Sequence, residues 1–286
     1  MRQTRIVLGV TIALVLAAIA TSSAQQAASP KRINRILERI DEGKPALVNA
    51  DWDWIEMEIG IYDVAELKAR LAKLKTGKEA PAVTPVLRVP IGGDEPFQWI
   101  VKQALQMGLS SIVIPQVDTA EQAKKLVEAM RLPQPLGSKY PVPQGVRSSG
   151  APLAGQYWGV SGGEYARRAD VWPLNPDGEM LAIVMVESKA AVDHINEIVN
   201  VPGLGGIMLG PADLRANIGL TTKADAVPAA VEAAIQTALK ACLAKKKMIC
   251  AIAGVPPADR DKRIKEGFNM VHGNFGTTPY GQYIRL

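Results

Sequence analysis

Two uncharged, mostly apolar runs, each followed at once by an acidic residue or an acid-containing turn, mark the middle of the chain. Leu181–Val186 and Gly206–Leu209 contain no charged residue, which is typical of strands buried on both faces of a parallel sheet. Between them, Lys189–Val199 carries apolar residues at helical spacing, and Pro202-Gly203 ends that pattern. The pattern therefore predicts strand, helix and strand, which is the repeating unit of an α/β fold.

The same alternation extends along most of the chain. Apolar residues at a spacing of three and four predict helices at Arg32–Ile40, Asp63–Leu74, Phe97–Met107, Ala120–Met130, Glu164–Ala169, Pro228–Ala244 and Ala258–Glu266. Short apolar runs predict strands at Ala46–Asn49, Trp52–Met57, Val83–Val89, Ser111–Ile114, Met248–Ala251 and Phe268–His272. This number of alternating elements favours a (β/α)₈ TIM barrel, with a doubly wound sheet as the alternative.

Two stretches depart from a regular barrel. Only two residues separate Ala46–Asn49 from Trp52–Met57, so we expect a shortened first βα unit and a barrel that is irregular or open there. Residues 132–153 form a long loop rich in proline and glycine, which we expect to reach over the strand ends. Tyr140 and Arg147 are the loop residues that could close over a ligand, although nothing in the pattern fixes their position.

The N-terminal segment, residues 1–24, has the features of a secretory signal peptide. Arg2 and Arg5 precede a continuous apolar run, Ile6–Ala20, and small residues lead to Ala24. The run is shorter than the roughly 20 residues that a spanning helix needs. We therefore expect cleavage after Ala24 rather than an uncleaved anchor, with a periplasmic or secreted product that has no membrane segment of its own.

Composition places the rest, residues 25–286, in the class of globular proteins of one barrel-sized domain, followed by a tail at 273–286 without periodicity. The net charge of +5 falls to +3 without Arg2 and Arg5, and the basic residues are scattered, which argues against a nucleic-acid partner. Two cysteines and two histidines show no zinc-ligand spacing. We expect Cys242 and Cys250 to be free, buried thiols, with a disulfide as the alternative.

The two acids that follow the central strands are the first candidates for chemistry. Glu187 comes directly after Val186, and Asp213 follows Leu209 by four residues. Ligand sites of parallel α/β folds lie at the carboxyl ends of the strands, and neighbouring strands are roughly 5 Å apart. Glu187 and Asp213 could therefore share one hard cation such as Mg²⁺ or Mn²⁺. The alternative is that each carboxylate only caps the helix that follows it.

These motifs resemble the HpcH/HpaI aldolase family. The likeness rests on Glu-x-x-x-Ala-Val at Glu187 and on Gly-Pro-Ala-Asp-Leu at Gly210, and it extends from about Ile36 to about Gly273. It implies that Glu187 and Asp213 hold a divalent metal, Mg²⁺, Mn²⁺ or Co²⁺. It also implies that the backbone around Pro211, Ala212 and Asp213 binds the carboxylate of a 2-oxo acid such as pyruvate.

The resemblance further implies that Arg88 contacts the oxo group and that Glu58 supports metal-bound water, with Glu56 in place of the family's aspartate. The alternative for Arg88 is an arginine that is only paired with an acid at the rim. Three positions depart from the family pattern. Ile59 stands where the family has its basic histidine, Gln106 replaces an acid linked to base function and aldehyde binding, and Met185 replaces a polar residue. His272 could face the site as another base, although a structural role is the stronger expectation, and His194 is expected at the surface.

The function implied is that of a metal-dependent carbon–carbon lyase acting on a 2-oxo acid and an aldehyde. The alternative is a secreted protein that binds metal and 2-oxo acid but has lost the aldolase base. A citrate-lyase-like enzyme acting on coenzyme A esters shares the fold, but it fits poorly with export. The resemblance also implies a homo-oligomer, either a hexamer or a dimer.

Overall fold

The computed structural model describes residues 31–59, 62–220 and 227–273. The expected signal peptide and nearly all of the expected tail lie outside the described residues. The fold is that of the unit from Arg32 onward. Among the described residues, no helix combines the length and apolar character needed to span a membrane.

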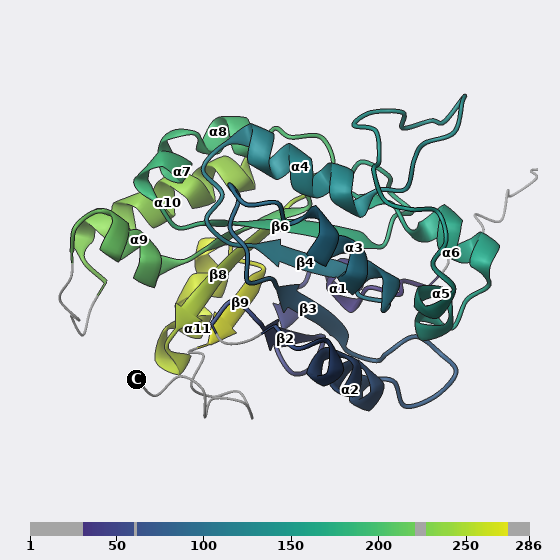
Figure 1. Ribbon diagram of the computed structural model, residues 1–286. Helices are drawn as coiled ribbons and strands as arrows, with labels where there is room; N and C mark the ends of the chain where they lie inside the picture. Colours follow the sequence, from purple (N-terminus) through teal and green to yellow (C-terminus); the bar gives the residue numbers. More distant parts are fainter. Residues whose placement is uncertain (1–30, 60–61, 221–226, 274–286) are drawn as a thin grey trace, which may run out of the picture. The chain divides into compact units, whose positions relative to one another are not determined.

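Eight parallel strands form a barrel that is nearly closed (Figure 1). In order around the sheet they are β1 Ala46–Leu47, β9 Met270–Gly273, β8 Ile249–Val255, β7 Gly206–Leu209, β6 Met180–Val186, β4 Ser111–Ile114, β3 Thr84–Arg88 and β2 Trp52–Glu56. An isolated bridge between Val48 and Trp52 links the two ends of this path. The predicted TIM-like barrel is confirmed, and no helix separates β1 from β2, as the short spacing indicated.

Most helices surround the barrel, whereas α1 packs into its interior, and most lie close to their predicted positions. They are α1 Arg35–Asp41, α2 Val64–Leu74, α3 Gln98–Gln106, α4 Ala120–Met130, α5 Pro152–Trp158, α6 Gly162–Arg168, α7 Lys189–Asp193, α8 Ile195–Ile198, α9 Pro211–Asn217, α10 Ala229–Leu243 and α11 Arg260–Glu266. The stretch predicted as one helix at Lys189–Val199 is broken at His194, whose backbone is not helical. Helix α5 and the short strand β5 (Val171–Trp172), which pairs with β6, were not predicted, and α9 was expected only in the alternative in which Asp213 caps it.

The core has two layers, and β6 shows how the sequence builds both. Leu181, Ile183 and Met185 belong to a cluster inside the barrel, which also contains Trp52 and Trp54. The alternate residues of β6 belong to the larger cluster between the strands and the outer helices. Because successive side chains of a strand point to opposite faces, an uninterrupted apolar run fills both layers. Strand β6 can therefore present a polar residue only where it ends.

The long loop lies at the end of the barrel opposite to the predicted one. It begins at Arg131, where α4 ends, and outer helices run antiparallel to the strands, so the chain is back at the strand starts. Arg131 is fully buried and donates to Asp170 at 2.7 Å and to the carbonyl of Tyr140 at 2.8 Å. The Asp170 carbonyl in turn accepts from Met180, the first residue of β6. The expectation that the loop reaches over the carboxyl ends of the strands is therefore wrong, and Arg147 is buried near the Tyr165 ring.

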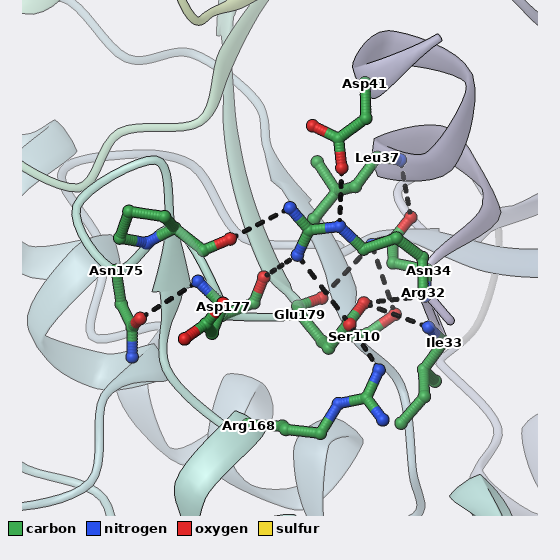
Figure 2. A network of polar contacts seen from close by, with 12 residues as sticks. Arg32, Ile33, Asn34, Leu37, Asp41, Ser110, Arg168, Asn175, Asp177 and Glu179 are labelled. Atoms are coloured by element: carbon green, nitrogen blue, oxygen red, sulfur yellow. Dashed lines mark hydrogen bonds and ion pairs between the residues drawn. The ribbon is translucent and has the colours of Figure 1, made fainter. Parts of the chain in front are cut away.

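A second polar network holds the segment before α1 against the start of β6 (Figure 2). Glu179 is only 1% exposed and accepts from the main-chain N–H groups of Ile33 and Asn34, at 3.2 and 2.8 Å, and from Arg168 at 2.6 Å. Asn34 then caps α1 with its side chain. Ile36 and Leu37 of α1 pack into the inner cluster, so this network fixes the helix that fills the barrel at its strand-start end.

Cys242 and Cys250 form a disulfide, which corrects the expectation of two free thiols. Cys242 lies in the last turn of α10 and Cys250 in β8, and their Cα atoms are 5.9 Å apart because α10 packs on β8. The sequence places these residues in separate elements but does not show that the helix returns directly onto the next strand. Both sulfurs are buried, as predicted.

Reduction of this disulfide is expected to destabilise the protein by about 2–3 kcal/mol, the loop-entropy value for a short closed loop. For a domain of this size that corresponds to a fall of roughly 5–10 °C in melting temperature. The measurement compares thermal unfolding with and without dithiothreitol, and a C242A/C250A variant serves as the reductant-insensitive control. Equal melting temperatures for the oxidised and reduced wild-type protein would contradict the expectation.

Candidate functional site

Glu187 and Asp213 lie at the carboxyl ends of two paired strands. The last hydrogen-bonded register of β6 and β7 joins Val186 to Leu209, and the N–H of Gly210 donates to the Val186 carbonyl at 3.2 Å. Glu187 does not cap α7, because Ser188 is the capping residue, and α9 has no side-chain cap. The capping interpretation of these two acids is therefore wrong. Both carboxylates line one pocket of about 640 Å³.

Glycine at position 210 allows the close approach of Glu187 in its observed rotamer. A Cβ atom added to Gly210 would lie 2.6 Å from Oε2 of Glu187 and 3.2 Å from Cε of Met185. Both distances are too short for a side chain to be accommodated without a shift. The Gly-Pro turn of the sequence motif thus makes room for the carboxylate as well as starting α9.

One oxygen of Glu187 is buried without a hydrogen-bond partner. The residue is 4% exposed; its Oε1 accepts from the backbone N–H of Gln116 at 2.7 Å, whereas Oε2 has no partner among the described residues. Burial raises the pKa of Glu187 to about 7, and repulsion from Asp213 and Glu58 adds to this, against the Gln116 N–H and Arg88. A negatively charged carboxylate oxygen that is buried and has no hydrogen-bond partner is stabilised by either a proton or a cation.

The donor set fits a divalent cation that keeps open positions. Glu187 and Asp213 supply two carboxylates, and within residues 31–59, 62–220 and 227–273 no group of three or more Asp, Glu, His or Cys side chains could hold a metal. Oxygen donors suit Mg²⁺ and Mn²⁺, and Mg²⁺ in particular is commonly bound by one or two carboxylates plus water and substrate. The unpartnered Oε2 of Glu187 is the observation that supports a cation at this position.

Arg88 ends β3 inside a clamp of two acids. Its Nε and Nη2 donate to Glu56 at 2.7–3.1 Å, and its Nη1 lies 2.5 Å from Glu58 and 3.5 Å from the sulfur of Met185. The guanidinium is only 2% exposed. Burial raises the pKa of Glu58, and repulsion from Glu56 and Asp213 adds to this against the attraction of Arg88. These interactions bring the ends of β2 and β3 into electrostatic contact with Asp213 after β7.

The other candidates from the sequence lie elsewhere. His272 is buried in the barrel against Trp52 and Trp54, at ring distances of 5.7 and 5.0 Å, and burial, then Arg88, lowers its pKa to about 4. It is thus a neutral structural residue, and His194 is exposed as expected. Gln106 ends α3 and donates to the carbonyl of Gly150 at 2.6 Å, within the loop at the strand starts.

The pocket wall contains residues that sequence reasoning missed. Besides Glu187 and Asp213, the lining is Gly92, Gly93, Asp94, Glu95, Gln116, Asp118, Ser188, Ala216 and Asn217. All of them follow the strands β3, β4, β6 or β7, so a search restricted to the residues directly after each predicted strand would have included several. Arg88 and Glu58 adjoin this set without forming the wall, and Ile59 is 47% exposed.

Comparisons with known proteins identify the family. A family model described as HpcH/HpaI aldolase/citrate lyase matches residues 43–280. A hydroxypyruvate/pyruvate aldolase of Roseovarius nubinhibens is 36% identical over 197 residues, which cover 68% of this chain and 66% of that protein. A 2-keto-3-deoxy-L-rhamnonate aldolase of Salmonella schwarzengrund is 30% identical over 237 residues, 82% of this chain and 78% of that one. The matches to the hydroxypyruvate/pyruvate aldolases span 53–66% of their length.

Solved structures of other proteins have the same fold as this chain. A HpcH/HpaI aldolase/citrate lyase family protein from Burkholderia cenocepacia J2315 superposes with a TM-score of 0.68 at 23% identity, over 84% of this chain and 92% of that one. At this identity the likeness shows the fold alone. The family model, which matches most of the chain, and the relatives at 30% identity and above carry the assignment. The chain belongs to the HpcH/HpaI aldolase/citrate lyase family.

Proposed function

We propose that this protein is a divalent-metal-dependent carbon–carbon lyase that acts on 2-oxo acids such as pyruvate together with an aldehyde. The observation that carries the proposal is the buried, unpartnered Oε2 of Glu187 beside Asp213 in a pocket at the carboxyl ends of the strands. The relatives named as aldolases support the reaction class. Mg²⁺, Mn²⁺ and Co²⁺ all suit the donor set in this proposal.

In the cleavage direction, the C3–C4 bond of a 4-hydroxy-2-oxo acid breaks. The C4 hydroxyl gives its proton to a base and becomes the aldehyde, the bonding pair becomes the enolate of the 2-oxo acid, and C3 then takes up a proton. A divalent cation bound between Glu187 and Asp213 would polarise the oxo group and stabilise the enolate charge. Substrate binding, stabilisation of the oxyanion and proton transfer are assigned to residues of the chain.

The residues around the pocket have distinct roles in this proposal, and Asp213 and Glu58 have two each. Ala212 and Asp213 lie in the first turn of α9, where N–H groups have no intrahelical partner and can bind the substrate carboxylate. Pro211 begins the helix without needing an N–H of its own. Arg88, held by Glu56 and Glu58, offers a fixed guanidinium to the developing oxyanion. Glu58, whose pKa is raised, is the candidate for proton transfer.

The second candidate function is a protein that binds metal and 2-oxo acid without turnover. Ile59 favours it, because its exposed hydrocarbon side chain stands next to Glu58, where the sequence resemblance implies a basic histidine, and it can transfer no proton. The loss of a positioned base typically costs 10²–10⁴-fold in rate. This candidate and the lyase share the metal site and differ only in catalysis.

Export belongs to the proposal as well. The disulfide between Cys242 and Cys250 supports an oxidising compartment, in keeping with the signal-peptide pattern of residues 1–24. We place the mature protein in the periplasm or outside the cell. Assembly as a hexamer or a dimer is likewise proposed.

The deciding experiment assays purified mature protein for condensation of pyruvate with aldehydes in the presence of Mg²⁺, Mn²⁺ or Co²⁺. Metal-dependent product formation supports the lyase. No product, together with a metal-dependent rise in melting temperature on addition of pyruvate, would establish the binding protein instead. Neither product nor stabilisation would refute both.

The charge of the pocket wall gives a prediction about the aldehyde. Asp94, Glu95 and Asp118 line the pocket in addition to the metal carboxylates, and no lysine or arginine is among the described lining residues. A cleft lined by one sign of charge repels ligands of the same sign. We expect kcat/KM for a neutral hydroxyaldehyde to exceed that for a carboxylated aldehyde of equal length by roughly tenfold or more. Comparing the two at low and high salt checks this, because the difference should shrink as salt rises.

A further inference from the structure

The backbone of Gln116 has a conformation that few side chains tolerate. Its φ is +54°, in the left-handed region, although the residue is not glycine. Gln116 follows β4 in the turn Pro115-Gln116-Val117 and lines the pocket beside Glu187. Strained residues of this kind persist where the surrounding structure holds them, and they are frequent at functional sites.

In this conformation the main-chain N–H of Gln116 contacts Glu187. The N–H points at Oε1 of Glu187, with a nitrogen–oxygen distance of 2.7 Å. Oε1 is thereby occupied, and the other oxygen of the same carboxylate, Oε2, is the one left buried and unpartnered. The hydrogen bond thus fixes both the rotation of the carboxylate and the identity of the oxygen that remains available.

Two glycines after β3 hold the Gln116 turn from the other side. The N–H of Gly93 donates to the carbonyls of Pro115 and Gln116, at 3.1 and 3.2 Å. A Cβ atom on Gly93 would lie 2.8 Å from the Gln116 carbonyl oxygen, and one on Gly92 would lie 2.9 Å from the Gln116 side-chain oxygen. The Gly92-Gly93 pair therefore allows the close backbone contact that supports the turn.

We infer that Gln116 is a positioning residue for the metal carboxylate, acting through its main-chain N–H and not through its side chain. The inference rests on the proposed metal site at Glu187 and Asp213. Partners that orient a metal ligand typically contribute 10–100-fold to metal affinity. The role belongs to a backbone conformation, which explains why no residue motif indicated it.

A matched pair of substitutions separates the backbone from the side chain. Gln116→Gly and Gln116→Val both remove the side-chain amide and both keep an N–H. Glycine adopts positive φ without strain, whereas a β-branched residue does not, so the valine variant should turn its N–H away from Glu187. We expect Q116V to weaken Mn²⁺ binding by about 10–100-fold and Q116G to weaken it by less than about threefold.

The measurement is titration of the metal-free full-length mature protein with Mn²⁺ alone, followed by electron paramagnetic resonance of the free ion. Circular dichroism and thermal unfolding without metal show whether each variant is folded. Gly93→Ala is the second variant, because it presses on the Gln116 carbonyl without altering residue 116, and it should weaken Mn²⁺ binding in the same way. In an E187Q background, Q116V should change the residual affinity by less than about twofold, because the carboxylate that the N–H of residue 116 positions is then absent.

Each outcome decides a separate question. Folded Q116V and G93A that bind Mn²⁺ like wild type would overturn the inference while leaving the metal site intact. Equal weakening in Q116G and Q116V would assign the effect to the side chain and would also overturn it. A wild-type protein that takes up no Mn²⁺ would refute the proposed function itself, and the positioning role with it.

Discussion

Replacing Glu187 with glutamine is expected to weaken Mn²⁺ binding by at least about 100-fold, more than is typical for the loss of an outer-shell partner. The variant should also lose the metal-dependent stabilisation by pyruvate. The introduced amide has nearly the same shape as the carboxylate, and its oxygen could still accept from the N–H of Gln116. It lacks the negative charge that a divalent cation requires from its few protein ligands. The measurement is Mn²⁺ titration of both proteins, with turnover assayed in parallel.

The same substitution should stabilise the metal-free protein above neutral pH. The pKa of Glu187 is about 7 in the folded protein, chiefly through burial, whereas an unfolded glutamate titrates near 4.3. Between these two values the folded state binds more protons than the unfolded state, so wild-type stability falls as pH rises from about 4.5 to about 7 and is then constant. The loss amounts to about 3 kcal/mol at pH 8. Because glutamine does not titrate, the E187Q variant does not lose this stability as pH rises.

The two effects have opposite signs, so their combination is diagnostic. At pH 8 without metal, E187Q should melt above wild type, and at saturating Mn²⁺ wild type should melt above E187Q. Glu197→Gln, an exposed change of the same chemistry in α8, is the control and should leave both curves unchanged. The metal assignment would be contradicted if Mn²⁺ stabilised E187Q as much as wild type.

The sequence predicted those parts of the fold that depend on local pattern. Ser111–Ile114, Ala120–Met130 and Gly206–Leu209 have the bounds that periodicity indicated, because a strand buried on both faces and an amphipathic helix leave direct traces in residue order. Short elements leave weaker traces in the residue order. Strand β5 has only two residues, too few for a period to be visible, and α5 begins inside the proline- and glycine-rich stretch that was interpreted as a loop.

Direction and proximity were harder to predict than the elements themselves. The long loop was expected at the carboxyl ends of the strands, yet it follows α4, and an outer helix of a barrel returns the chain to the strand starts. Chain direction alone could have corrected that prediction. The disulfide was different, because residues 242 and 250 belong to separate elements, and only the packing of α10 on β8 brings them together.

The candidate site divides in the same way. Glu187 and Asp213 were predicted because their positions after strands are a property of residue order. The clamp of Glu56 and Glu58 on Arg88 depends on side-chain rotamers, and the role of Gln116 depends on one φ angle. Neither the rotamers nor the φ angle can be inferred from the type of residue at a position in the sequence. The sequence therefore predicted the two acids of the proposed metal site but not the backbone conformation that orients Glu187.

Replacing Glu179 with glutamine is expected to lower the free energy of unfolding by about 3–5 kcal/mol, the usual cost of breaking a buried ion pair by removing one partner. The carboxylate of Glu179 meets two main-chain N–H groups and Arg168, which is itself buried (Figure 2). Glutamine removes the charge that Arg168 faces and puts two donor hydrogens where only acceptors are needed. Because Ile36 and Leu37 of α1 depend on this anchor, the inner core should loosen with it.

The loss of stability expected for E179Q depends on the burial of the carboxylate. The same network contains an exposed ion pair that tests this dependence. Arg32 reaches Asp41 at 2.8 Å at the exposed end of the network, and exposed ion pairs contribute only about 0–1 kcal/mol. Asp41→Asn is therefore the matched control, since it removes one carboxylate charge from the same cluster. Urea unfolding of both variants, with the slope compared as well as the midpoint, gives the two free energies. If D41N and E179Q lost equal stability, the anchoring of α1 could not be assigned to the buried carboxylate.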